Sequence, residues 1–343
     1  MRALYLIKNG KADKALELRD TDIPEVGSSE IRIKSEAFGL NFADVMARLG
    51  LYPDAPKKPG ILGYDVVGRV DAISGDVDTD LKEGDRVIAL TRFGGYGQYV
   101  STDYRGVVKI KDDMSPVIAT ALATQGGTAY YMAYEMVNIF EGDHVLVHAA
   151  AGGVGSLLCQ MAKSKGAIVY GTAGSSEKLE YLKSIGVDYP INYRSLKFEK
   201  EINAVLNKSD VKGLDVIFDA IGGSSVRKGL KLLNSGGRII LFGASAMTSA
   251  KNVFSKIGVG LGFGIFHPVA LLDPSKSMIA VNMLRIADDK PEIINRVLKG
   301  AVRLYEAGVI QPKEGGLYPI EEFAQAHSDL ELRKTMGKLA IKW

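Results

Sequence analysis

The sequence has very few of the residues that bind soft metals or form disulfides. It has one cysteine, Cys159, and four histidines among 343 residues. A single cysteine excludes an intrachain disulfide and a four-cysteine zinc site. No cysteine and histidine stand at the spacing of a metal-binding pair, so we expect no metal. The same scarcity argues against a cysteine–histidine nucleophile, and the sequence has no G-x-S-x-G motif of the serine hydrolases.

The sequence also lacks a strong charge surplus and a long apolar run. Lys and Arg number 43 and Asp and Glu number 40, a difference too small to predict nucleic acid as a partner. Residues 257–272 are weakly polar but are interrupted by glycines, His267 and Pro268, short of the ~20 residues of a membrane helix. The apolar run in residues 1–8 is too short for a signal peptide. We therefore expect a cytoplasmic protein without a membrane partner.

Glycine, by contrast, is abundant, with 39 residues that cluster between apolar runs as tight turns do. Up to about residue 120 the pattern is β-rich, with short strands expected at 30–35, 65–70 and 85–90. Beyond that point apolar strands alternate with helices, which predicts an α/β fold with a doubly wound parallel sheet. The expected strands of this second half are 145–147, 167–171, 187–191, 214–219, 238–243 and a further candidate at 278–282.

The chain is thus expected to divide into three segments. Residues 1–124 form a β-rich domain, residues 125–285 a nucleotide-binding domain, and residues 286–343 a C-terminal segment that rejoins the first domain. The C-terminal segment contains an amphipathic helix after Pro291 and a closing strand at 338–341.

A glycine turn separates the first strand of the α/β half from its first helix. It runs from His148 to Gly155 and matches the dinucleotide motif G-x-G-x-x-G, with Ala150 at the first glycine position followed by Gly152 and Gly155. Glycine at 152 would let the main chain approach a pyrophosphate, and glycine at 155 would let the helix pack closely on the strand. The helix N-terminus would present free N–H groups to the phosphates. The turn predicts dinucleotide binding.

The type of nicotinamide cofactor is indicated at the end of the second strand of this half. NAD-binding proteins place an acidic residue there, and residues 171–176 contain none. Lys178 and the Ser175 hydroxyl could hold a 2′-phosphate, and Tyr193 and Arg194 could cover it. These residues favour NADPH as the cofactor. Glu177, next to Lys178, weakens this assignment, and NADH stays open.

Motifs along the whole chain carry a resemblance to a known family. They are residues 39–44, 48–53, 63–68, 83–87, 95–99, 148–155, 191–194 and 337–339. Together they resemble the zinc-free quinone oxidoreductase branch of the medium-chain dehydrogenase/reductase superfamily. Residues 222–284 and 307–312 are similar to the vesicle amine transport protein homologues within it. Zinc-dependent relatives have His-Glu where this chain has Tyr64-Asp65.

This resemblance implies a GroES-like domain in residues 1–124, a Rossmann domain, an active site in the cleft between them, and a homodimer that pairs through the Rossmann sheets. It also implies that Asn41 and Tyr52 are the catalytic residues. The implied cofactor-binding residues are Asn41, Thr128, Ala150, Gly152, Gly153, Val154, Gly155, Ser175, Lys178, Tyr193, Gly243, Ala244, Ser245, Asn282 and Arg333.

Two functional hypotheses follow. The first is an NADPH-dependent reductase of quinones or other α,β-unsaturated carbonyl compounds that needs no zinc. The second is a cofactor-binding adaptor or lipid-handling protein with little turnover. Residues 258–272 could be a substrate lid, a dimer contact or a membrane-surface patch. Structural roles also stay open for Asn41, as the cap of a turn, and for Tyr52, as a half-buried packing residue.

Overall fold

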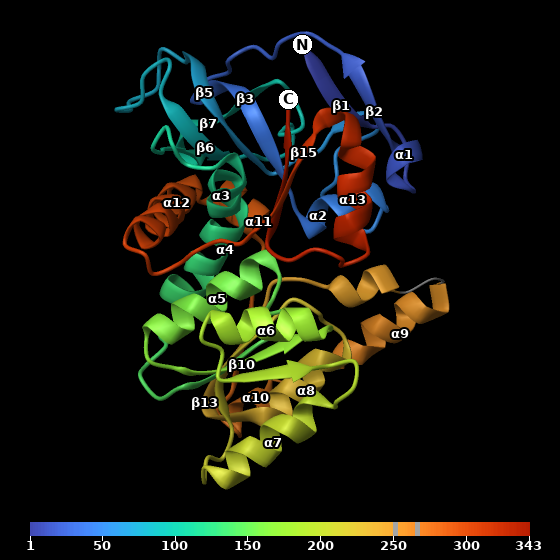
Figure 1. Cartoon of the computed structure of the whole chain (residues 1–343), viewed down its shortest axis with the longest axis vertical. Helices are drawn as coiled ribbons and strands as arrows, with labels where there is room; N and C mark the ends of the chain where they lie inside the picture. The colour runs from blue at the N-terminus through green and yellow to red at the C-terminus, as the bar shows by residue number, and fades with distance from the viewer. Residues whose placement is uncertain (250–252, 265–267) are drawn as a thin grey trace. The chain divides into compact units, whose positions relative to one another are not determined.

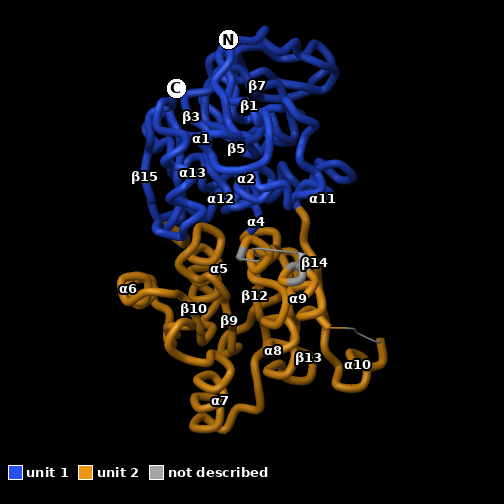
Figure 2. Tube along the Cα trace, turned by 90° about the vertical axis from the view of Figure 1, so that its right-hand side faces the viewer, with its two compact units in different colours: residues 1–128, 283–307, 312–343 blue, residues 129–282, 308–311 orange. Residues whose placement is uncertain are grey.

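The computed structural model describes residues 1–249, 253–264 and 268–343. The chain divides into two compact units (Figures 1 and 2). Unit 1 comprises residues Met1–Thr128, Met283–Ala307 and Pro312–Trp343, and unit 2 comprises Ala129–Asn282 and Gly308–Gln311. The boundaries expected at 124 and 285 lie a few residues from those of the units. The short return of residues 308–311 to unit 2 was not anticipated.

In the described part of the chain, unit 1 is built on a seven-stranded sheet. The order is β15-β16-β3-β5-β6-β8, with β7 paired to β3. The pairing of β15 with β16 is parallel and the others are antiparallel. The expected strands at 30–35, 65–70, 85–90 and 338–341 are confirmed. The strands are β3 (Glu30–Leu40), β5 (Asp65–Ile73), β6 (Arg86–Leu90), β7 (Tyr99–Asp103), β8 (Val107–Lys109), β15 (Glu314–Pro319) and β16 (Lys338–Lys342).

A smaller sheet of order β2-β1-β4 and several helices complete unit 1. The inward side chains of both sheets form one apolar core that includes Leu4, Phe38 and Ile341. The remaining elements are β1 (Arg2–Leu6), β2 (Leu16–Asp20), β4 (Gly60–Ile61), α1 (Ala12–Ala15), α2 (Phe42–Arg48), α3 (Pro116–Thr120), α11 (Met283–Asp289), α12 (Pro291–Glu306) and α13 (Phe323–Glu331).

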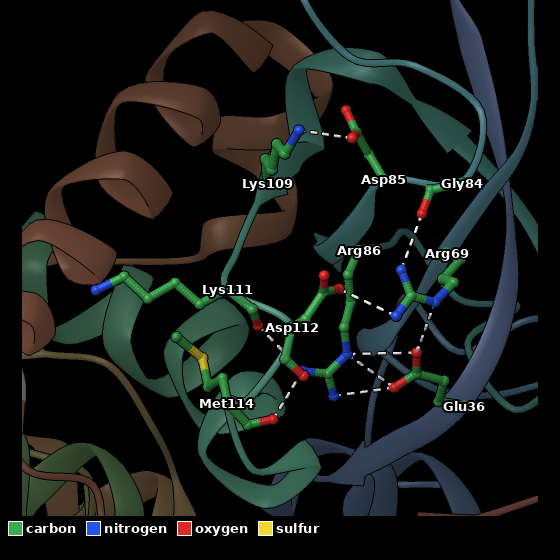
Figure 3. Close-up of polar contacts among 9 residues, drawn as sticks. All are labelled: Glu36, Arg69, Gly84, Asp85, Arg86, Lys109, Lys111, Asp112 and Met114. Atoms are coloured by element: carbon green, nitrogen blue, oxygen red, sulfur yellow. Dashed lines mark hydrogen bonds and ion pairs between the residues drawn. The ribbon is translucent and has the colours of Figure 1, made fainter.

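A buried arginine fixes the segment between β8 and α3 (Figure 3). The Arg86 side chain pairs with Glu36 at 2.9 Å, and its Nη1 donates to three backbone carbonyls, those of Lys111, Asp112 and Met114. Because the guanidinium carries five N–H donors in a planar fork, it can satisfy a carboxylate and several carbonyls at once. Arg86 therefore holds the last part of the sheet against the start of the long helical segment that follows.

That helical segment runs from residue 116 to residue 136 and contains two π-helical stretches. These are residues Ala121–Gly126 and Tyr131–Met136, on either side of α4 (Gly127–Tyr130). Gly126 and Gly127 contact α12: an added Cβ would lie 3.1 Å from Ala301 and 3.3 Å from Leu298, respectively. Gln125, Gly126 and Gly127 thus lie where a wider helical turn packs closely on another helix.

Unit 2 has a six-stranded parallel sheet among its described residues. Its order is β11-β10-β9-β12-β13-β14, so the expected doubly wound sheet is confirmed. From β9 the chain adds strands first on one side of the sheet (β10, β11) and then on the other (β12, β13, β14). Ligands bind at such a switch point, between β9 and β12, in folds of this kind. The strands are β9 (His144–Val147), β10 (Ile168–Ala173), β11 (Tyr189–Asn192), β12 (Leu214–Asp219), β13 (Leu233–Leu241) and β14 (Ser277–Ala280).

Helices connect these strands, and those between residues 153 and 232 pack on the sheet (Figure 1). They bury apolar side chains such as Leu158, Ile202 and Val226 against the strands. The helices are α5 (Gly153–Ser164), α6 (Ser176–Ser184), α7 (Phe198–Lys208), α8 (Ser224–Leu232), α9 (Val253–Phe263) and α10 (Val269–Leu272). His267, singled out from the sequence, lies outside the described residues.

Candidate functional site

The turn after β9 is shaped so that a ligand can approach the main chain at the start of α5. Ala149 has φ 52°, and Gly152 is the N-cap of the helix. An added Cβ at Gly155 would meet the carbonyl of Ala149 and lie 2.9 Å from Cα of Ala150. The first turn of α5 has no acidic residue, and its N–H groups have no acceptor within the helix. The turn therefore suits an anionic diphosphate.

The loops after β10 and β11 meet, as the predicted 2′-phosphate pocket requires. An added Cβ at Gly174 would lie 2.7 Å from the Tyr193 hydroxyl and 3.1 Å from Nε of Arg194. Ser175 caps α6, its hydroxyl oxygen accepting from the Lys178 N–H at 3.4 Å. The Tyr193 hydroxyl and the Arg194 guanidinium thus lie next to the loop that leads to the Ser175 cap, with Lys178 in the first turn of the helix that follows.

The loops after β12 and β13 are joined by main-chain hydrogen bonds. Asp219 is fully buried, and its Oδ1 accepts from the Gly222 N–H at 2.9 Å. The Ser245 N–H donates to Ala220 O at 3.1 Å. An added Cβ at Gly243 would lie 2.8 Å from that same carbonyl oxygen. The predicted segment from Gly243 to Ser245 therefore lies along the carboxyl edge of the sheet.

In unit 1, Asn41 belongs to a buried charged cluster. Asp65 and Lys338 are both fully buried and form an ion pair of 2.7 Å. The Asn41 amide lies on this pair: Nδ2 donates to Asp65 at 2.8 Å, and Oδ1 accepts from Lys338 at 2.9 Å. By donor count one amide N–H is left for another partner. The two hydrogen bonds fix the orientation of the Asn41 amide, whether Asn41 acts as a catalytic residue or as the cap of a turn.

Tyr52, the other predicted catalytic residue, is partly buried in the loop after α2. Its ring meets that of Tyr64 edge-on, with 6.2 Å between the centroids. Burial raises the pKa of Tyr52, and the nearby carboxylate of Asp54 raises it further. Tyr52 is therefore protonated at neutral pH and is able to donate a proton.

Comparison with known proteins gives the family. The alcohol dehydrogenase GroES-like domain matches residues 27–113, and the zinc-binding dehydrogenase domain matches residues 153–263. The synaptic vesicle membrane protein VAT-1 homolog of Homo sapiens is 33% identical over 99% of this chain and 86% of that protein. The chain belongs to the medium-chain dehydrogenase/reductase superfamily.

Solved structures of this superfamily agree with the branch that the sequence motifs indicate. The crystal structure of the human VAT-1 homolog-like protein superposes with a TM-score of 0.84 at 29% identity, covering 100% of this chain and 98% of that chain. Escherichia coli quinone oxidoreductase, solved with NADPH, gives a TM-score of 0.84 at 26% identity and covers 100% of both chains. The GroES-like and Rossmann domains are thus confirmed, and the chain is an oxidoreductase of this superfamily.

The other predicted site residues lie at the ends of elements. Thr128 is in α4. Asn282 lies just after β14, where the Val281 N–H still donates to Leu241 O of the neighbouring strand at 2.9 Å. Arg333 has φ 56°, and its guanidinium lies 5.9 Å from the Phe42 ring centroid, next to Asn41 in the sequence. The roles that family resemblance implies for them stay predictions. Among the described residues, no group of three or more His, Cys, Asp or Glu side chains could hold a metal ion.

Sequence reasoning missed the buried partners of Asn41. Asp44 is fully buried and accepts from the Asn41 N–H at 2.8 Å. Tyr96 and His327, also buried, lie with Oη and Nε2 3.2 Å apart. Burial raises the pKa of Asp44 to about 7, helped by Asp65, and burial together with Arg48 lowers the pKa of His327 to about 3. The one signal in the sequence for this cluster was Asp44, an acidic residue between the apolar residues Ala43 and Val45.

These two shifts predict opposing effects of pH on stability. The pKa of Asp44 rises from 3.8 to about 7 on folding, so its contribution to stability is present below pH 4 and is lost by pH 7. The pKa of His327 falls from 6.5 to about 3, so its contribution is present above pH 6.5 and is lost at lower pH. Asp44→Asn keeps an acceptor for Asn41 and should leave the His327 slope alone. Its free energy of unfolding should rise between pH 4 and 6.5 by up to about 1.4 kcal/mol per pH unit more steeply than the wild type.

Urea unfolding at several pH values measures this slope. The His327→Gln variant is the matched control, because it should leave the Asp44 slope and change the pH dependence in the opposite direction. Identical pH profiles for the wild type and both variants would contradict the assignment.

Proposed function

We propose that this protein is an NADPH-dependent reductase of quinones or other α,β-unsaturated carbonyl compounds. The observation that carries the proposal is the glycine turn at Gly152 and Gly155. The proposed 2′-phosphate pocket, with Ser175, Lys178 and Tyr193, is on the loops after the next two strands and at the start of α6. The turn fits a diphosphate, and the side chains of this pocket fit a 2′-phosphate. NADPH is the cofactor named for the E. coli quinone oxidoreductase structure, which supports the same cofactor here.

In the proposed reaction NADPH supplies a hydride to the conjugated acceptor. The N–H groups at the start of α5 bind the diphosphate, and Lys178 and Arg194 neutralise the 2′-phosphate. The Asn41 amide, oriented by Asp65 and Lys338, donates a hydrogen bond to the developing oxyanion. Tyr52 donates the proton that completes the reduction. We propose that the reaction needs no zinc, because a conjugated acceptor spreads the developing charge itself.

An acceptor screen tests this function. Purified protein is mixed with NADPH and a panel of quinones and enones, and the absorbance at 340 nm is followed. We expect acceptor-dependent oxidation with at least one class and a slower rate with NADH. NADPH binding by calorimetry without oxidation by any acceptor would contradict the reductase proposal and retain the cofactor assignment.

The cofactor preference yields a second prediction. Lys178→Ala should raise the Kd for NADPH by about tenfold, because one charge-assisted bond to the 2′-phosphate is lost. The Kd for NADH, which lacks that phosphate, should not change. Lys183→Ala is the matched control, since Lys183 lies on the same helix and pairs with Glu180 at 2.8 Å. Calorimetric titrations measure both constants, and equal losses for the two nucleotides would contradict the assignment.

We also propose a homodimer that pairs through the Rossmann sheet. In the described residues β14 is an edge strand of that sheet, and an open edge presents unpaired main-chain groups to a second chain. Light scattering of the purified protein tests the assembly, and a monomer at micromolar concentration would contradict it.

A lipid-handling adaptor is the second candidate function. It is favoured by the exposed apolar side chains of α9 and α10, among them Leu261 at 69% and Leu272 at 77% exposure, and by the likeness to VAT-1 homologues. No helix in the described residues is long and apolar enough to span a membrane. Flotation with liposomes tests this candidate, which fails if all the protein stays in the aqueous fraction.

A further inference from the structure

Tyr64 is a buried tyrosine whose hydroxyl has no structural use in the protein. The side chain is 4% exposed, and its hydroxyl has no partner at hydrogen-bonding geometry. A buried hydroxyl without a partner loses the hydrogen bonds that water gave it, at a cost of about 1–3 kcal/mol. Phenylalanine would fill the same space without that cost. The presence of the hydroxyl therefore calls for a role outside packing.

The position of Tyr64 is held rigidly by its neighbours. Its carbonyl accepts from the Thr91 N–H at 2.8 Å, and the Thr91 hydroxyl donates to Gly63 O at 3.0 Å. The next residue, Asp65, is the buried partner of Lys338. On one side the Tyr64 ring packs against Phe93, with 5.2 Å between the centroids. Its hydroxyl therefore has a fixed place in unit 1.

The other neighbour of Tyr64 is the proposed proton donor, Tyr52. Their rings meet edge-on at an interplanar angle of 68°. The two side chains also affect each other's ionisation: Tyr64 lowers the pKa of Tyr52, and Tyr52 raises that of Tyr64. A hydroxyl that donates a hydrogen bond to Tyr52 favours the ionised form of Tyr52, and the buried, partnerless Tyr64 hydroxyl is available as such a donor.

The charged groups around Tyr52 give little stabilisation to its ionised form. The carboxylates of Asp54 and Asp44 raise the pKa of Tyr52, and Arg285 lowers it by the smallest contribution. Arg285 is itself paired with Asp54. Arg92, a second cation near Tyr52, is paired with Asp288. The ionised form of Tyr52 thus has anionic neighbours, and carboxylates already neutralise the two cations. A neutral hydrogen-bond donor is the group that can stabilise it.

We propose that Tyr64 is a positioning residue for the proposed reductase reaction, and that its hydroxyl donates a hydrogen bond to the oxygen of Tyr52 while Tyr52 gives its proton to the reduced acceptor. In that step the O–H bond of Tyr52 breaks and an O–H bond forms on the oxygen of the enolate or of the hydroquinone anion. Tyr64 keeps its own proton. The Tyr52 phenolate, held by the Tyr64 hydroxyl, regains a proton from water. This inference rests on the proposed function.

Tyr64→Phe tests the proposal because it removes only the hydroxyl. We expect kcat to fall about tenfold with an enone acceptor, the loss expected for one hydrogen bond to a charged group, with KM for NADPH unchanged. The alkaline limb of the kcat profile should move to higher pH, because Tyr52 becomes a weaker acid. In a Tyr52→Phe background, Tyr64→Phe should have no further effect.

A control and a measurement without turnover complete the test. Tyr318→Phe removes a hydroxyl that donates to Asp329 at 3.2 Å in the same unit, and it should leave kcat and its pH profile unchanged. In protein labelled with 13C at the tyrosine Cζ atoms, Tyr64→Phe should move the titration of Tyr52 to higher pH. The proposal is overturned if kcat and the Tyr52 titration both match the wild type, or if the two phenylalanine substitutions act additively. A shifted titration in a protein that reduces no acceptor supports the Tyr64–Tyr52 bond and contradicts the reductase function alone.

Discussion

Lys338→Met is expected to lower the free energy of unfolding by about 3–5 kcal/mol, because it leaves Asp65 charged and buried without its cation. Both side chains are fully buried, and their 2.7 Å contact joins β16 to the start of β5. Asn41 shares both partners and cannot replace the lost charge. Equilibrium unfolding in guanidinium chloride, followed by circular dichroism, measures the change.

A double variant separates the lost charge pair from lost packing. Asp65→Asn added to Lys338→Met removes the isolated anion and keeps a polar group next to Asn41, so it should recover at least half of the lost stability. Lys342→Met, at the exposed end of the same strand, should change the stability by less than about 0.5 kcal/mol. Equal stabilities for the single and the double variant would contradict the prediction, because the unpaired charge of Asp65 would then not be the cause of the loss.

Gly155→Ala is expected to weaken NADPH binding by about 100-fold or more, about 2.7 kcal/mol. The added Cβ would meet the Ala149 carbonyl and the Cα of Ala150, both in the backbone of the turn itself. A backbone atom cannot move aside as a side chain does, so the turn or α5 has to shift. The N–H groups at the start of the helix then no longer converge on the diphosphate. Isothermal titration calorimetry with NADPH measures the loss.

Gly258→Ala is the matched control in unit 2, since no atom lies within 4 Å of the added Cβ and the residue is in helix α9. It should bind NADPH like the wild type. Circular dichroism spectra establish whether each variant is folded. A folded Gly155→Ala variant with unchanged affinity would show that the turn does not carry the diphosphate, and would remove the main support for the proposed function.

The strands of unit 2 could be predicted because their signal is local. A parallel strand buried on both faces reads as a short apolar run, and 214–219 is β12 to the residue. The predicted cofactor residues of unit 2 follow such runs, so the order of strands is enough to bring their loops to one edge. The π-helical stretches at 121–126 and 131–136 could not be predicted, because the first packs on α12 and the second on α5, helices distant in the sequence.

By itself, then, the sequence determined the two-part fold, the glycine turn, and the family to which the chain belongs, since each of these depends on residues close together in the chain. The tertiary structure decided the partners of the proposed catalytic residues. Lys338 reaches Asp65 across 273 positions, and the Tyr64 ring meets Tyr52 from a separate loop. The shifted pKa values of Asp44 and His327 also arise from burial and from charges distant in the sequence. Such contacts carry no local pattern, because they depend on how strands and loops far apart in the chain are brought together.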